Sequence, residues 1–202
     1  MAFEFNPETH IYKNDGRVLP SVTQILKQVG VVDDTYYTDE SANFGTYGHS
    51  VLKLALCNNL ESYDPAIESW AIGIIKFIAE QKPIPFKNMV IENCTEKMVH
   101  DDRFAGTLDF VGNINKFPTR PCVLDWKFWS AANKNVLALA GLQTAAYAYL
   151  FKKEIGLKPL AIKRGVVHFS QNNYRIYELN DPADEPTFMS ALNLVTWKGQ
   201  HK

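Results

Sequence analysis

Apolar residues recur along this chain with two different periods, and each period predicts a different kind of element. A spacing of three and four residues predicts a helix, as in 66–81, where Trp70, Ile74 and Phe77 form one stripe. Alternation at every second residue predicts a strand, as in 122–129. On these criteria we expect helices near 20–26, 39–56, 66–81 and 136–153, and strands near 89–99, 106–114, 122–129, 161–170 and 174–179.

Polar and glycine-containing segments mark the ends of these elements. Asp15-Gly16 predicts the turn of an N-terminal hairpin, Ser21 should cap the first helix, and Asp64-Pro65 should begin the third. One short helix is expected in the tail after residue 181. Helices on either side of a run of strands predict an α/β fold, with a central mixed sheet flanked by helices.

Length and composition fit one domain over residues 1–202. Of the 202 residues 46% are apolar, which allows a substantial core. No stretch approaches the roughly 20 apolar residues of a membrane span, and the first residues lack the pattern of a signal peptide. We therefore expect a soluble, cytoplasmic protein without membrane association.

Cys57, Cys94 and Cys122 are odd in number and far apart, which fits neither a disulfide framework nor a Cys-x-x-Cys metal ribbon. Three scattered cysteines also do not supply the ligands of a four-cysteine iron–sulfur cluster. We expect buried, reduced thiols and no iron–sulfur cluster.

The formal net charge of −1 conceals an uneven distribution. Between Lys116 and Arg175 there are ten lysines and arginines against only Asp125 and Glu154, a net +8, so the rest of the chain carries −9. A locally basic half suits a protein that holds a polyanion on one face. Two solvated faces without a partner explain the same pattern equally well.

Two opposite charges interrupt the apolar segment 122–129. Asp125 and Lys127 are two residues apart, so on a strand both side chains project from one face while Trp126 faces the other way. Each ion loses several kcal/mol of hydration in such a strand. An ion pair is the simpler explanation for these two residues alone, and further converging carboxylates would favour a catalytic site.

A second carboxylate lies in the preceding apolar segment, 106–114. Asp109 would meet Asp125 if the two strands are adjacent, and Gly106 permits a close approach there. Mg²⁺ is often bound by one or two carboxylates, with waters and a substrate phosphate completing its shell. Two aspartates are therefore sufficient for a magnesium site.

Other segments offer further candidate side chains. Glu92 and Glu96 share one face of the preceding strand, and either could reach the site. His49 points inward from its helix, where a lone histidine is more often a core residue than a ligand. Gln143 and Tyr147, four residues apart on one helical face, suit contacts to phosphate or simple packing.

The order of these motifs resembles the PD-(D/E)XK nuclease superfamily, in its RecB-like and phage-type exonuclease branch. Each motif alone is weak, but four in the same order are fairly specific. Phe44 departs from the pattern, since relatives often carry a basic residue before Gly-Thr. The similar segments are Gly45-Thr46-Tyr47-Gly48-His49, Glu96 followed by Ala105-Gly106-Thr107-Leu108-Asp109, Asp125-Trp126-Lys127, and Gln143-Thr144-Ala145-Ala146-Tyr147.

The resemblance implies a restriction-endonuclease-like core and a metal-dependent DNA exonuclease that acts in recombination, repair or phage DNA processing. It implies that Mg²⁺, with Mn²⁺ as a substitute, is bound by His49, Asp109, Asp125 and the backbone carbonyl of Trp126. Lys127 would then serve the attacking water.

The resemblance also assigns supporting residues and partners. Glu96 would join the catalytic set, and Gln143 and Tyr147 would contact DNA. Partners would be DNA and either a recombination protein or further copies of the chain, in the cytoplasm of a bacterial or phage-infected cell. Two other hypotheses stay open: a DNA-end or junction binding module without catalysis, and a hydrolase of small phosphorylated substrates.

Overall fold

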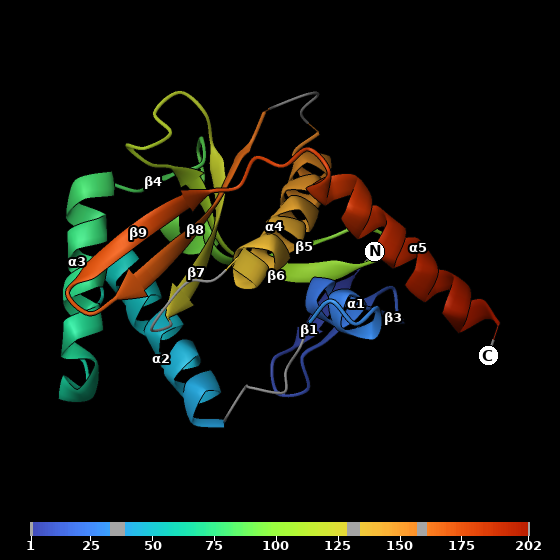
Figure 1. The fold of residues 1–202 in the computed structure, drawn as a ribbon, viewed down its shortest axis with the longest axis horizontal. Helices are drawn as coiled ribbons and strands as arrows, with labels where there is room; N and C mark the ends of the chain where they lie inside the picture. Colours follow the sequence, from blue (N-terminus) through green and yellow to red (C-terminus); the bar gives the residue numbers. More distant parts are fainter. Residues whose placement is uncertain (1, 33–38, 129–133, 157–160, 202) are drawn as a thin grey trace.

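The computed structural model describes residues 2–32, 39–128, 134–156 and 161–201. A curled mixed sheet of six strands lies at its centre, with helices packed around it (Figure 1). The strand order is β4-β6-β7-β8-β9, and β5 also pairs with β6. Strands β7 and β8 are parallel, and the other neighbours are antiparallel. The predicted α/β fold with a central mixed sheet is confirmed.

The elements follow the order expected from the apolar periods. The central sheet consists of β4 (Ile84–Pro85), β5 (Thr95–His100), β6 (Ala105–Asn113), β7 (Cys122–Phe128), β8 (Lys163–Ser170) and β9 (Asn173–Glu178). A smaller antiparallel sheet consists of β1 (Phe3–Asn6), β2 (Ile11–Asn14) and β3 (Arg17–Leu19). The helices are α1 (Val22–Gln28), α2 (Asp39–Leu56), α3 (Glu68–Gln81), α4 (Lys134–Glu154) and α5 (Asp184–Gln200), with 3-10 turns η1 (Pro65–Ile67) and η2 (Ile91–Asn93).

The side chains of β7 alternate, so its two faces meet different helices. Trp126 is buried and packs against Phe77 of α3, with ring centroids 5.5 Å apart. Lys127 projects the other way and lines a cavity together with Gln143 of α4. The indole of Trp126 is therefore a core group. Trp129, the last residue of the predicted strand 122–129, lies outside the described residues.

The small sheet is attached to the main one through β6, at the end of the molecule away from α3 (Figure 1). Tyr12 is buried against Leu19 and Ala105, and its hydroxyl is hydrogen-bonded to Oγ1 of Thr107 at 2.8 Å. Ser21 and Ala105 form a parallel bridge. The start of β6 is thus fixed by the N-terminal strands as well as by β5.

The sequence correctly predicted the cap of the first helix and the turn of the N-terminal hairpin. Ser21 caps α1 in a complete capping box with Gln24. Asp15 and Gly16 have φ of 49° and 78°, the positive values that a two-residue hairpin turn requires. Asp64 caps a 3-10 turn before α3 rather than α3 itself, a small correction to the predicted helix start.

Two predicted elements differ in extent. The strand expected over 89–99 is confined to β5, because Ile91–Asn93 forms a 3-10 turn in which the N–H of Cys94 donates to the carbonyl of Ile91. Glu92 therefore does not share a strand face with Glu96. The short helix expected in the tail is the 17-residue α5, anchored by Phe188 and Leu192.

The cysteines and the helices bear on two further predictions. All three cysteines are free; Cys94 and Cys122 are buried and Cys57 is partly exposed. Burial raises the pKa of the Cys122 thiol, which keeps it protonated. Over the described part of the chain, no helix combines the length and apolar character needed to cross a membrane.

Candidate active site

Strands β6 and β7 part at the position of Asp109. Their antiparallel register pairs Gly112 with Cys122, Val111 with Val123, and Phe110 with Leu124, where the ladder ends. Asp109 and Asp125 would be the next pair. Instead, the backbone N–H of Trp126 donates to Oδ2 of Asp109 at 2.7 Å. A carboxylate thus takes the position of a ladder hydrogen bond, and the expected adjacency of the two aspartate-bearing strands is confirmed.

Asp125 and Lys127 form an ion pair on one face of β7. Nζ of Lys127 donates to Oδ1 of Asp125 at 2.8 Å and lies 2.7 Å from Oδ2. Only 3% of the Asp125 side chain is exposed, and Oδ2 is buried without a hydrogen bond of acceptable geometry. A buried carboxylate oxygen that retains acceptor capacity is suited to a further donor or to a cation.

His49 reaches the parting strands from α2. Its Nε2 is 3.2 Å from the carbonyl oxygen of Trp126, and its Nδ1 is 3.6 Å from Oδ1 of Asp109. A carbonyl oxygen only accepts hydrogen bonds, so Nε2 is the donor to Trp126, while Nδ1 faces the carboxylate of Asp109. This separation is too long for a good hydrogen bond and suits a shared proton or cation.

The close approach of α2 depends on Gly48. A Cβ atom at this position would lie 2.8 Å from ring carbons of Phe128. Phe128 is itself stacked on Phe169, with centroids 4.9 Å apart, so its ring has little room to retreat. A glycine immediately before His49 therefore sets the distance between helix and strand.

Burial dominates the electrostatics of Asp109. It raises the pKa of this carboxyl from 3.8 to about 6, and the neighbouring charge of Asp125 acts in the same direction. His49, Lys127 and the N–H of Trp126 oppose the shift without cancelling it. Such a shift is typical of functional sites, where a carboxylate is held ready for a cation or a proton.

Glu96 lies opposite Asp109 across β5 and β6, because the flanking pairs are Thr95 with Phe110 and Lys97 with Leu108. Its backbone is left-handed, with φ of 47°, which interrupts the ladder at this residue. Its carboxylate accepts a 2.7 Å bond from Nζ of Lys53. The structure thus brings Glu96 beside α2 rather than directly into contact with Asp109.

Lys53 was not among the residues predicted from the sequence. It follows His49 by four residues and therefore lies on the same face of α2. One helical face thus carries an imidazole to Asp109 and an ammonium to Glu96. The four-residue spacing from His49 was the signal available in the sequence.

Gln143 and Tyr147 differ in their access to solvent. Tyr147 is 5% exposed. Its ring packs directly on Gly106, because Cε1 lies only 2.5 Å from the position that a Cβ atom at Gly106 would take. Burial raises the pKa of the Tyr147 hydroxyl, and the charges of Asp109 and Asp125 act in the same direction. Gln143 donates to the Tyr147 hydroxyl at 3.2 Å and lines a cavity with Lys127.

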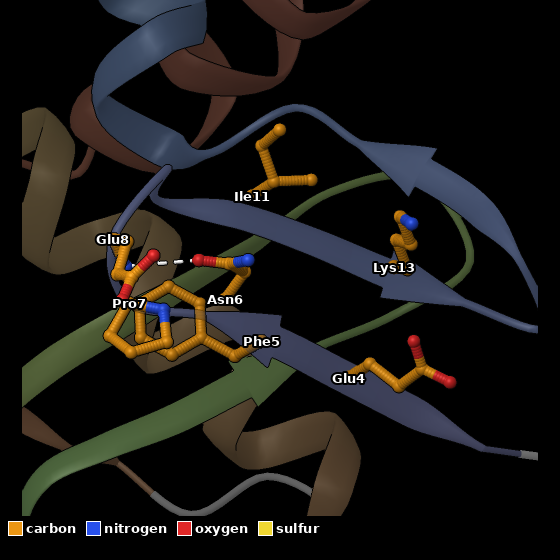
Figure 2. A pocket seen from close by; sticks show the side chains of 7 residues that line it. All are labelled: Glu4, Phe5, Asn6, Pro7, Glu8, Ile11 and Lys13. Atoms are coloured by element: carbon orange, nitrogen blue, oxygen red, sulfur yellow. Dashed lines mark hydrogen bonds between the residues drawn. The ribbon is translucent and has the colours of Figure 1, made fainter.

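That cavity has a volume of about 740 Å³ and lies between α1 and α4. A second hollow, of about 460 Å³, lies over β1 and β2 and is drawn in Figure 2. Glu4, Pro7 and Lys13 are among its lining residues, and the N–H of Glu8 donates to Asn6 within it. None of the predicted site residues lines this second hollow, so the cavity beside Lys127 is the one relevant to the site.

The ten lysines and arginines between Lys116 and Arg175 do not all contribute to one basic face. Four of its ten cations pair with acids from elsewhere in the chain, and Lys158 lies outside the described residues. The charge asymmetry is thus partly neutralised within the fold. The four pairs are Lys152 with Glu185, Lys153 with Asp101, Lys163 with Glu178, and Arg164 with Asp184.

The donor set is chemically suited to a hard divalent cation. It combines two carboxylates, one imidazole and the Trp126 carbonyl, and Mg²⁺ readily accepts one or two carboxylates with waters in its remaining positions. The buried Oδ2 of Asp125 adds an oxygen with acceptor capacity. Across the described residues no three His, Cys, Asp or Glu side chains already converge as a metal site, since Asp125 is turned toward Lys127.

Comparisons with known proteins leave the chain without a family. No family model matches it, and no curated protein matches its sequence. Among solved structures it is similar to "Crystal structure of SSO0001", with 13% identity and a TM-score of 0.34 over 85% of this chain and 81% of that one. At this score the likeness says nothing about function.

Proposed function

We propose that this chain is a magnesium-dependent deoxyribonuclease, and specifically an exonuclease of DNA recombination, repair or phage DNA processing. One observation carries the proposal. His49, Asp109 and the carbonyl of Trp126 are joined at the same parting of β6 and β7 that holds the buried pair of Asp125 and Lys127. Acids, an imidazole and an amine at one break in a sheet suit phosphodiester hydrolysis.

The position of each residue would determine its role in the reaction. Bound Mg²⁺ would neutralise charge on the scissile phosphate and make a water more acidic. His49, Asp109 and Asp125 would hold it, together with the Trp126 carbonyl. Lys127, fixed by Asp125, would donate a hydrogen bond to the attacking water and stabilise developing negative charge.

The direct test compares linear with closed circular DNA in Mg²⁺ or Mn²⁺. The wild type should degrade linear DNA, and Asp125→Ala and Lys127→Ala should each abolish degradation. Lys163→Ala is a matched control, because Lys163 is also a strand lysine in an ion pair, with Glu178 of the neighbouring β9. Unchanged degradation in both site variants would refute the proposed site, and equal degradation of circular DNA would refute the exonuclease.

A second candidate is a DNA-end or junction binding module without catalysis. It is favoured by the orientation of Asp125, which is held by Lys127 rather than turned to Asp109. Such a module would bind DNA in a salt-sensitive way with or without metal. Loss of Lys127 would leave that binding intact, whereas hydrolysis by the wild type would exclude this candidate.

A further inference from the structure

The cavity between α1 and α4 continues from the proposed site. Lys127 of β7 and Gln143 of α4 line it, together with Leu26 of α1 and Leu139 and Leu142 of α4. Leu26 is buried and the two leucines of α4 are half-buried, so their aliphatic side chains form walls instead of filling the space. An apolar chamber thus lies directly beside the amine proposed to serve the attacking water.

The charged residues of the cavity favour an anionic occupant. Lys27 from α1 and Lys127 from β7 both line it. Asp184 is the only acid among the described lining residues, and it is bound to Arg164 at 2.8 Å. The cavity therefore combines aliphatic walls with two lysines, of which Lys127 is also paired with Asp125, and with an acid paired to Arg164.

We propose that this cavity receives unpaired nucleotides, so that the enzyme acts on a single strand or on a frayed end. The inference rests on the nuclease function proposed above. An unpaired nucleotide presents a flat apolar base, which can pack against the aliphatic walls, and a charged phosphate, which suits the lysines. A duplex hides its bases in the stack and offers only its backbone and groove edges.

Size supports the same occupant. Pockets of about 300–1,000 Å³ hold molecules of the size of a drug or a nucleotide, and this cavity has about 740 Å³. A double helix does not enter such a space. The lining also has few groups able to read base edges, chiefly Thr23, Asn135 and Gln143, so binding should tolerate any base sequence.

The test blocks the cavity at Ala138 of α4. Ala138 lines the cavity but is exposed, so Ala138→Trp should fill the space without disturbing the core. Ala79→Trp is the matched control, because Ala79 is also an exposed helical alanine and lies on α3, away from the cavity. A thermal melt of each variant verifies folding.

Binding is measured by fluorescence anisotropy with labelled oligothymidylate of about ten nucleotides and with a blunt duplex of the same length, in Ca²⁺ and at one ionic strength. The wild type should prefer the single strand. Ala138→Trp should weaken single-strand binding by about tenfold, since it removes the burial of one base against the aliphatic walls, an apolar contact on the order of that factor. Ala79→Trp should bind like the wild type.

The outcomes separate this inference from the proposed function. Equal single-strand binding by Ala138→Trp and the wild type, or tighter binding of the blunt duplex, would overturn the role of the cavity and leave hydrolysis untouched. If no DNA is hydrolysed in Mg²⁺ but Ala138→Trp still loses single-strand binding, the cavity is upheld and the nuclease is refuted.

Discussion

The two halves of β6 differ in what lies along their edge toward β7. From Phe110 to Gly112 the strand pairs with β7 in a regular ladder. From Ala105 to Leu108 the strand pairs with β5, and beyond the bridge between Ala105 and Ser21 its other edge faces side chains. The carboxylate of Asp109 accepts from Trp126, and the ring of Tyr147 lies against Gly106.

The difference shows how a sheet can position chemistry. A buried backbone N–H needs a partner, and where the neighbouring strand has left, that partner must be a side chain. Here it is a carboxylate, which brings a negative charge into an apolar layer. The charge then requires cations, and His49 and Lys127 lie close enough to influence its ionisation. The half of β6 that pairs with β7, Phe110 to Gly112, is the closed half and contributes stability. The half from Ala105 to Asp109 is the open half and carries the candidate site.

The largest effect is expected from Asp109→Asn. An asparagine still accepts the hydrogen bond from Trp126 but removes the charge. Hydrolysis should fall by about a thousandfold, the scale seen when a main electrostatic group is lost. The metal-free variant should also be more stable than the wild type at pH 7, by on the order of 3 kcal/mol, because the raised pKa reports an unfavourable buried charge.

The pH dependence of this stability has a definite sign. The pKa of Asp109 is raised from 3.8 in the unfolded chain to about 6 in the folded protein. Its contribution is therefore fully present below about pH 4 and is lost as the pH rises through 6. Urea unfolding in EDTA at pH 5 and pH 7.5 should show this loss in the wild type. If Asp109→Asn lost the same amount of stability between these pH values, the pH dependence could not be attributed to Asp109.

Gly48→Ala should disturb the open half through α2. The new methyl group would lie 2.8 Å from the Phe128 ring, so the helix must shift and carry His49 with it. Calorimetric titration with Mn²⁺ should show about tenfold weaker binding, the usual effect of disturbing the support of a metal ligand. Gly45→Ala is the control, since its Cβ would meet nothing within 4 Å. Weakened Mn²⁺ binding in both variants would point to a general loss of helix integrity.

Substitutions at Gln143 and Tyr147 should distinguish a residue that contacts the substrate from a residue that only supports the first one. Gln143→Ala should raise KM for a DNA substrate by about tenfold if the amide holds a phosphate. Tyr147→Phe keeps the ring against Gly106 and loses only the bond from Gln143, so KM should rise about threefold or less and stability should fall by about 1 kcal/mol. A larger KM effect from Tyr147→Phe would place Tyr147 in direct contact with DNA.

The sequence predicted the strands that carry Asp109 and Asp125, because apolar alternation and turn residues are local signals. It did not predict that the N–H of Trp126 would bind Asp109, since that bond depends on where the ladder ends. The charge count from Lys116 to Arg175 suggested a basic face, but Arg164 pairs with Asp184 across the fold. Partners of this kind depend on tertiary register, which periodicity does not encode.

The smallest effect concerns Glu96, where the backbone of β5 departs from its ladder beside Asp109. Glu96→Ala and Glu96→Gly both remove the carboxylate that binds Lys53, but only glycine accepts the φ of 47° without strain. The glycine variant should therefore be more stable than the alanine variant by about 1 kcal/mol, as measured by urea unfolding.

Activity assays on the same two proteins test the role of the carboxylate independently of the backbone. If Glu96 acts in catalysis, both variants should lose activity equally despite their difference in stability. If activity instead follows stability, Glu96 serves the fold, and the ion pair with Lys53 only fixes the rim of the open half. Because exposed ion pairs contribute about 0–1 kcal/mol, Lys53→Ala should then resemble the wild type in both measurements.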